Sequence, residues 1–583
     1  MRFTFNDSRK HITVFRFGVA LILGLSLACG AAASATPRPQ AAPTTGAASV
    51  ATAPPASSPV APAVPATTAK ATPAPVAAKI TGKVTVMNAV WGNQLFDAKD
   101  ARAEVARHGR FVHAFWVAGN EKLEHIPGVL KSWRLSDDGL TWTLTVREGV
   151  KFHDGKELTV EDALFTLTDS HVPTALASKS AEIGRIVQKT EITGPNTIQV
   201  THKQVYISYI DVLSEQFPSS NYGALMPKAY MEQAGREGYN KAPVGAGPFK
   251  VVTFRPSEQM LMERFDDYYF QPKNGLYEDR RPKFKTLDLR LVPEAATRTA
   301  ALRAGEADIV ESSLQAKQQI ESGGGRLILV PEATYTWLFF NGCWKPELAC
   351  SKKDVRYALD YAIDKQLIYK QLYGEAGVAK GWTLATPSAL GYSPDLDPRP
   401  FDPQKARTLL EQAGYPGGRG FPKLEIHTWV AGEQPFMPEF AQLLADMLKK
   451  NLGIEVEVKV GESNAVVQAY QNRRVDGHLV LRPNEGRWDG GSSMNGGYAD
   501  LKSGSRRAED PELKKVVDTA LGVLDLAKQQ EAYNNMYKTL REAGYEIGLG
   551  YISLPWGVGP HIATWTPWQM NSNPSAWWTI TLK

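Results

Sequence analysis

The segment spanning residues 133–162 constrains the fold more than any other stretch of the chain. Apolar residues alternate with threonines over 141–146, and this period of two predicts a strand with one buried face. The Asp-Gly pair at 154–155 is preferred in tight hairpin turns and predicts a hairpin there. Thr159 precedes Asp162 by three positions, the spacing of a capping box at the start of a helix. The segment therefore predicts a scaffold of strands followed by a helix, with no catalytic role.

The length and charge of the chain limit its class. At 583 residues it is too long for one hydrophobic core, so two or three domains are expected. Residues 1–79 hold seven Lys or Arg and a single acid, Asp7, so this segment carries +6 while the whole chain carries +5. The remaining residues together carry −1, which gives no support for a nucleic-acid partner.

Residues 1–35 are typical of an export signal. Basic residues precede an apolar run at 17–28 that is too short to span a bilayer comfortably. Two processing routes stay open: small residues at 33–35 fit cleavage after Ala35, whereas Leu-Ser-Leu-Ala-Cys at 25–29 resembles a lipobox that places a lipid on Cys29. Both routes predict an extracytoplasmic protein, either periplasmic or lipid-anchored to the outer face of the cytoplasmic membrane.

Residues 36–79 consist mainly of Ala, Pro, Thr, Ser and Val and contain no aromatic or acidic side chain. Such a segment cannot bury enough apolar surface to offset the entropy lost on ordering. We therefore predict an extended, disordered tether between the export signal and the folded body.

Five segments, in order, resemble the motifs of one family. SDDGLTWTLTVREGVKFHDGKELTVED at 136–162 resembles the signature of the family 5 extracellular solute-binding proteins. The other matching segments are PVGAGPF at 243–249, LRAGEADIV at 302–310, DVRYALDYAIDKQLI at 354–368 and FDPQKARTLLEQAGY at 401–415. The resemblance covers roughly residues 84–583. It identifies the chain as a member of this family of peptide-, nickel- and oligosaccharide-binding subunits of ABC importers.

The resemblance implies an α/β fold of the periplasmic-binding-protein type, with two hinge-linked lobes and an extra subdomain. Lobe I is expected to comprise residues 80–118, 234–335 and 548–583. The inserted subdomain is expected at 119–233 and lobe II at 336–547. The aromatic-rich segment 334–342 ends in Asn-Gly and suits a strand that crosses between the lobes.

The same resemblance implies capture of a solute outside the cytoplasm and its delivery to an ABC permease and ATPase complex. The expected ligand is an oligopeptide or an oligosaccharide, the protein is expected to be a monomer, and neither a cofactor nor a metal is predicted. Two alternatives stay open: a secreted hydrolase, and a receptor that hands its ligand to a membrane sensor. The sequence contains no GxSxG, HExxH, Walker A or other catalytic motif, which disfavours an enzyme.

The loop within residues 479–501 is the predicted ligand-binding segment because it combines charged and aromatic residues after a buried strand. In peptide-binding relatives this region resembles GWxxDxxDP, whose first aspartate binds the ligand's α-ammonium group. Glu485 falls on that aspartate, Arg482 replaces the tryptophan and the Asp-Pro is missing, so a sugar ligand stays open. Trp488 and Asp489 complete the predicted set. The alternative is a solvated polar loop.

Tryptophan and cysteine residues give the remaining predictions. Trp337, Trp382 and Trp556 are candidate stacking surfaces for a ligand in the cleft. Cys343 and Cys350, seven positions apart, are a candidate disulfide in an oxidising compartment, with two buried thiols as the alternative. No Cys or His spacing typical of a structural metal site is present.

Overall fold

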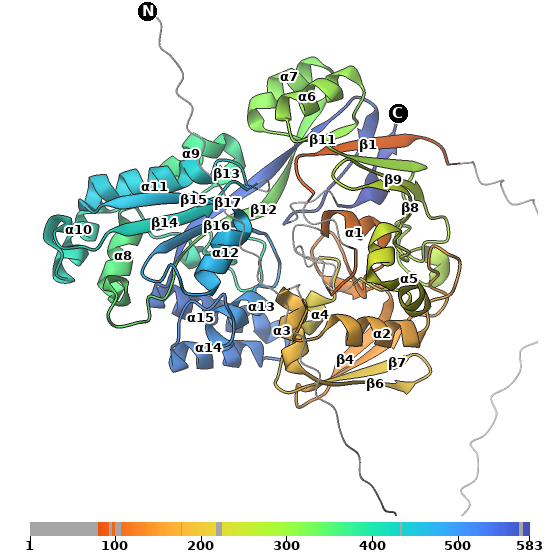
Figure 1. Cartoon of the computed structure of the whole chain (residues 1–583), viewed down its shortest axis with the longest axis horizontal. Helices are drawn as coiled ribbons and strands as arrows, with labels where there is room; N and C mark the ends of the chain where they lie inside the picture. The colour runs from red at the N-terminus through yellow and green to blue at the C-terminus, as the bar shows by residue number, and fades with distance from the viewer. Residues whose placement is uncertain are drawn as a thin grey trace, which may run out of the picture. The chain divides into compact units, whose positions relative to one another are not determined.

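A computed structural model describes residues 80–91, 96–99, 106–175, 178–216, 224–431, 434–570 and 575–583 (Figure 1). All of them belong to one compact unit, Ala77–Lys583. The predicted export signal, the tether and the lipid site at Cys29 lie outside the described residues. No helix in the described part of the chain is both long and apolar enough to cross a membrane.

One large mixed sheet organises the fold. Its strand order is β15-β14-β16-β12-β17-β11-β1-β10-β9-β8, with β13 paired to β17. The strands are β1 (Lys83–Asn88), β8 (Phe249–Arg255), β9 (Gln259–Arg264), β10 (Thr286–Leu291), β11 (Ile309–Glu311), β12 (Arg326–Phe340), β13 (Gly377–Val378), β14 (Leu424–Trp429), β15 (Val456–Gly461), β16 (Leu479–Glu485) and β17 (Glu546–Val558). Strands from the predicted lobe I form one end of this order and strands from the predicted lobe II form the other.

The long antiparallel pair β12 and β17 joins these two ends (Figure 1). The C-terminal half of β12 pairs with β16 of the predicted lobe II, while the C-terminal end of β17 pairs with β11 of the predicted lobe I. The register of the pair shifts between Val330 and Thr334, and Glu332 in the shift has a positive φ of 50°. Such a bulge bends and twists a strand locally. The strand β12 is thus irregular near its middle, where it pairs with β17.

A separate four-stranded sheet lies in the segment predicted as the inserted subdomain. Its order is β4-β5-β7-β6, formed by β4 (Leu130–Leu135), β5 (Thr141–Val146), β6 (Val187–Gly194) and β7 (Thr197–His202). The alternation in β5 is confirmed, because its three apolar residues are buried between partly exposed threonines. The capping box is also confirmed: Thr159 and Asp162 bond reciprocally at the start of α2 (Val160–Ser170). Gly155 lies in the predicted turn with a φ of 87°.

Helices cover both faces of the lobe II end of the large sheet. In β12, Leu338 and Phe340 pack into a core with helices α8 to α11, whereas Trp337 and Phe339 pack into a second core with α14 and α15. Burial of both faces explains why this strand is apolar throughout. The remaining helices are α1 (Ala106–Val112), α3 (Ser178–Ile186), α4 (Tyr209–Val212), α5 (Lys228–Lys241), α6 (Ala295–Ala304), α7 (Lys317–Ser322), α8 (Lys353–Tyr361), α9 (Lys365–Tyr373), α10 (Pro403–Gln412), α11 (Met437–Leu452), α12 (Ser463–Gln471), α13 (Gly491–Met494), α14 (Pro511–Leu521) and α15 (Leu526–Ala543).

Two short hairpin-like pairs complete the fold: β2 (Val117–Gly119) with β3 (His125–Pro127), and β18 (Ile562–Thr564) with β19 (Thr581–Leu582). Cys343 and Cys350 form a disulfide in the structure, with Cα atoms 5.3 Å apart. This bridge closes the turn that follows β12 and leads into α8. The domain boundaries given above stay predictions, because the described body forms a single compact unit.

Candidate functional site

The predicted ligand-binding loop begins where β16 ends, at Glu485. Glu485 lies opposite Thr334 of β12, beside the register shift described above. The next residue, Gly486, donates its N–H to the carbonyl of Ala333 at 2.9 Å. A Cβ at Gly486 would lie 2.1 Å from the carbonyl oxygen of Glu332, so only glycine fits there. The loop therefore leaves the sheet at a fixed point, next to the irregular middle of β12.

Glu485 is half-buried and lies in the electrostatic field of a cation that the sequence did not indicate. Burial lowers the pKa of the Arg110 guanidinium, and the negative charges of Glu485 and Glu215 oppose that shift. Arg110 comes from α1 of the predicted lobe I, whereas Glu485 comes from lobe II. Arg110 therefore lies within the electrostatic range of two acids, Glu485 from the predicted lobe II and Glu215 from the predicted inserted subdomain.

Arg482 points into lobe II and not into this loop. Its Nη1 donates to the Tyr470 hydroxyl at 2.8 Å, and its guanidinium lies 5.5 Å from the ring centroid of Trp337. Trp488 is half-buried; its carbonyl accepts from the Leu390 N–H at 2.8 Å. The four predicted loop residues therefore do not form one cluster, because Arg482 contacts Tyr470 and Trp337 instead.

Asp489 is buried and binds the inserted subdomain. The Ser208 hydroxyl donates to its Oδ2 at 2.8 Å, and the Gly491 N–H donates to its Oδ1 at 2.6 Å. Burial raises the pKa of Asp489 to about 6, and the nearby carboxylate of Asp211 adds to the shift. Other bonds join the same two parts: Arg185 to Asp500 at 3.1 Å and the Asn495 amide to Glu182 at 3.2 Å. The loop and α13 thus dock on α3 and α4 (Figure 1).

The three predicted stacking tryptophans are all buried. Trp337 donates its Nε1–H to Glu546 at 2.8 Å and lies 3.9 Å from the Arg507 guanidinium. Trp382 packs in the same core cluster as Trp337. These packed positions do not favour a ligand role, so the proposed site leaves the two residues out. Trp556 differs, because it lines a cavity.

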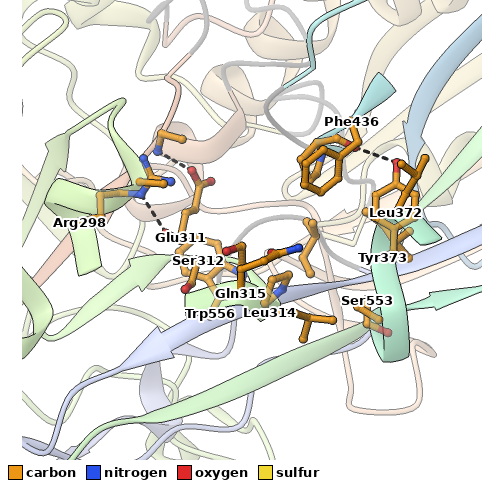
Figure 2. Close-up of a pocket in the computed structure, with 18 residues that line it drawn as sticks. Arg298, Glu311, Ser312, Leu314, Gln315, Leu372, Tyr373, Phe436, Ser553 and Trp556 are labelled. Carbon is orange, nitrogen blue, oxygen red and sulfur yellow. Dashed lines mark hydrogen bonds between the residues drawn. The ribbon is translucent and has the colours of Figure 1, made fainter. Parts of the chain in front are cut away.

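That cavity, of about 430 Å³, lies against the strand β17 (Figure 2). Its walls come from distant parts of the chain: Arg298, Glu311 and Leu314 on one side, and Leu372, Tyr373 and Phe436 on the other, with residues 552–556 of β17 between them. The Arg298 guanidinium donates to three backbone carbonyls, among them Glu311 at 2.8 Å. The Tyr373 hydroxyl donates to Pro435. Because these polar groups are engaged, the cavity suits an apolar ligand group.

We name this cavity the hinge pocket because it lies against the connecting strand β17. No local sequence motif indicates it, because its lining residues come from separate segments. Sequence reasoning also missed Arg110, which lies in a short helix without a charged pattern. Within the described residues, no group of three or more His, Cys, Asp or Glu side chains is arranged to hold a metal ion.

Comparisons with known proteins agree with this fold. The model of the bacterial extracellular solute-binding proteins, family 5, matches residues 124–503. The glutathione-binding protein GsiB of Escherichia coli O157:H7 is 30% identical over 331 residues, and that of Salmonella typhi 29% over 335. In both cases the match covers 55% of this chain and only 59% of the relative.

Solved structures match more of the chain at lower identity. The ABC transporter-associated periplasmic binding protein DppA of Helicobacter pylori, in complex with the peptide STSA, has a TM-score of 0.70 at 20% identity, covering 86% of this chain and 98% of that one. NikZ of Campylobacter jejuni, in complex with Ni(L-His), has a TM-score of 0.68 at 18% identity, covering 85% and 98%. The predicted periplasmic-binding-protein fold is thereby confirmed. Since the family model spans more than half of its length, the chain belongs to family 5 of the bacterial extracellular solute-binding proteins.

Proposed function

We propose that this protein binds a short peptide outside the cytoplasm and delivers it to an ABC permease and ATPase complex. The proposal is supported by the end of β16, where Glu485, from the predicted lobe II, lies in the electrostatic field of Arg110, from the predicted lobe I. A peptide carries an ammonium group and a carboxylate, and this acid and base can bind one each. A neutral sugar has no charged group that could pair with either side chain.

The strands that connect the two predicted lobes can bend, and closure of the lobes on a ligand requires such bending. Both lobes share β12 and β17, whose register shift provides a place for bending. Hinge closure around a ligand is a recurring transition in binding proteins of this kind. The hinge pocket lies against β17 and has walls from both sides, so its width changes with closure. An apolar side chain of the peptide fits that pocket.

The predicted location and processing are part of the proposal. The export signal and tether would place the body outside the cytoplasmic membrane, either free after cleavage at Ala35 or anchored through a lipid on Cys29. The relatives named above are binding proteins, which supports binding without catalysis. A role in sensing would use the same site and differ only in the membrane partner.

Native mass spectrometry of the exported protein, as purified, tests the ligand class. We expect a co-purified mass that corresponds to a short peptide. Isothermal titration with glutathione and with Ser-Thr-Ser-Ala, after removal of the bound ligand by partial unfolding, then measures affinity directly. Cellobiose serves as the neutral control. Tight binding of cellobiose with no response to either peptide would refute the peptide proposal and favour an oligosaccharide.

A further inference from the structure

A second cavity, of about 760 Å³, lies between the inserted subdomain and the loop that follows β16. The subdomain contributes Trp133, Trp142 and Asp211, and the loop contributes Trp488 and Asp489. Trp488 and Asp489 belong to the loop that is predicted to bind the ligand. The structure instead places both in this cavity, which does not include Glu485 among its lining residues.

The lining of this cavity is acidic. Four carboxylate residues line it, Glu124, Asp137, Asp211 and Asp489, and no Lys or Arg is among the described residues that do so. The one basic side chain is that of His125, whose Nε2 lies 3.4 Å from Asp211 Oδ1. A cavity with this excess of negative charge is suited to a cationic ligand.

The buried carboxylate of Asp211 independently indicates that this cavity binds a ligand. Its side chain is only 5% exposed, and among the described residues its Oδ2 has no hydrogen-bond partner. The indole N–H of Trp142, a residue 6% exposed, is equally without an acceptor in the described part of the chain. Buried polar atoms are normally paired, so each such exception requires an explanation. A ligand with a cationic centre and an oxygen acceptor satisfies both atoms.

Aromatic rings define the kind of cation. Trp133, Trp142 and Trp488 all line the cavity, and tryptophan faces attract cations more strongly than other aromatic side chains. An organic ammonium group can contact a ring face and a carboxylate together. Because the described residues hold no cluster of metal-ligating side chains, the donor set favours an organic cation over a metal ion.

We propose that this cavity binds an organic cation with an alkylated ammonium group and a nearby hydroxyl, separately from the peptide site. The bound cation would contact Asp211 of the subdomain and Asp489 of the loop at once. It would thus strengthen the contact between the two parts. The groups that face Asp489 are Ser208, Asp211 and Tyr206 from the subdomain, with His125 beyond Asp211, and Tyr533 and Tyr537 from α15.

The raised pKa of Asp489 agrees with this arrangement, since burial and the Asp211 carboxylate both disfavour its charged form. A cation between the two carboxylates offsets their repulsion. Binding should therefore strengthen as the pH rises through about 6.

Titration of the purified protein with choline, followed by calorimetry and tryptophan fluorescence, tests the proposal. Tetramethylammonium keeps the charge and lacks the hydroxyl, whereas 3,3-dimethyl-1-butanol keeps the shape and hydroxyl and lacks the charge. We expect choline to bind most tightly, tetramethylammonium more weakly and the neutral alcohol at least about tenfold more weakly than choline. Equal binding of choline and the neutral alcohol, or no binding of choline, would overturn the proposal.

Variants locate the site. Asp211→Asn should weaken choline binding about tenfold, while Asp267→Asn, which removes the same charge from an exposed aspartate outside the cavity, should leave it within a factor of two. Trp133→Leu provides a second variant should Asp211→Asn unfold the subdomain. Glu485→Gln should leave choline affinity unchanged, which separates this site from the peptide site. Wild-type affinity in both Asp211→Asn and Trp133→Leu would refute the assignment.

Discussion

Replacement of Glu485 by glutamine tests the peptide site most directly. Glutamine keeps the size and hydrogen-bonding capacity of the side chain and removes its charge. If Glu485 binds the α-ammonium group of a peptide, the variant leaves that cation without its counter-charge in a closed cleft. Because Glu485 is half-buried at the end of β16, its loss should have little effect on the melting temperature of the unliganded protein.

The expected loss of affinity follows from the environment of Glu485. Removing one side of a buried, hydrogen-bonded charge pair costs roughly 2–5 kcal/mol. The lower part of the range, about 2–3 kcal/mol, applies here because Glu485 is half-buried and Arg110 lies in its field. At about 1.4 kcal/mol per factor of ten, peptide affinity should fall about 30- to 150-fold.

Isothermal titration with the co-purified peptide measures this loss, and two variants control it. Glu347→Gln removes an exposed charge of the same kind from lobe II and should leave affinity within a factor of two. Arg110→Gln tests whether Arg110 binds the ligand itself or only lies beside Glu485. If Arg110 binds the peptide carboxylate, its loss should weaken peptides but leave an amine without a carboxylate unaffected. An unchanged affinity in Glu485→Gln would show that Glu485 is an ordinary acid beside Arg110, and the charge argument would fail.

Four further outcomes are expected. Cys343 and Cys350 should both resist thiol labelling in the exported protein, and Cys350→Ser should lower the free energy of unfolding by about 2–3 kcal/mol; quantitative labelling of both would contradict this. A chain that starts at Ile80 should melt within one or two degrees of the mature form, because the removed segment lacks core-forming residues. Scattering should show a smaller radius of gyration with bound peptide than without it, and no change at saturation would argue against closure. The pKa of Asp489 is raised to about 6 in the folded protein, against 3.8 as the ordinary value, so between these pH values the folded protein holds a proton that the unfolded chain loses. The free energy of unfolding that comes from this proton is fully present below about pH 4 and is lost as the pH rises through 6. Urea unfolding should show this fall in the wild type and a smaller fall in Asp489→Asn.

Local structure was largely predictable from the sequence because short-range rules determine it. The capping box at Thr159 and the cap of α10 by Asp402, which accepts from the Lys405 N–H at 2.9 Å, follow from residues within one helical turn. Ala413 is the C-cap of α10, and Gly414 follows it with a φ of 97°. Such boundaries depend on which residue takes the left-handed conformation.

The candidate site was less predictable because it depends on contacts between distant segments. Nothing near Glu485 in the sequence indicates Arg110, more than 300 positions away in the chain. Trp337 was a reasonable candidate for a ligand surface, yet its ring faces a core in which Glu546 and Arg507 engage it. Alternation along β12 assigns a side chain to a face of the sheet, but only tertiary packing determines whether a helix covers that face.

Two of the bonds that join the inserted subdomain to the loop after β16 are weakened by exposure or by repulsion. The Arg185–Asp500 pair is partly exposed on both sides, and exposed pairs contribute about 0–1 kcal/mol. The Asp489–Ser208 bond is opposed by the repulsion between Asp489 and Asp211. Suppose that the open form outnumbers the closed form by about ten to one. A ligand that favours the closed form by about 3 kcal/mol then changes a one-to-ten population into more than ten-to-one. The bound ligand would then determine whether a membrane partner binds the open or the closed form of the protein.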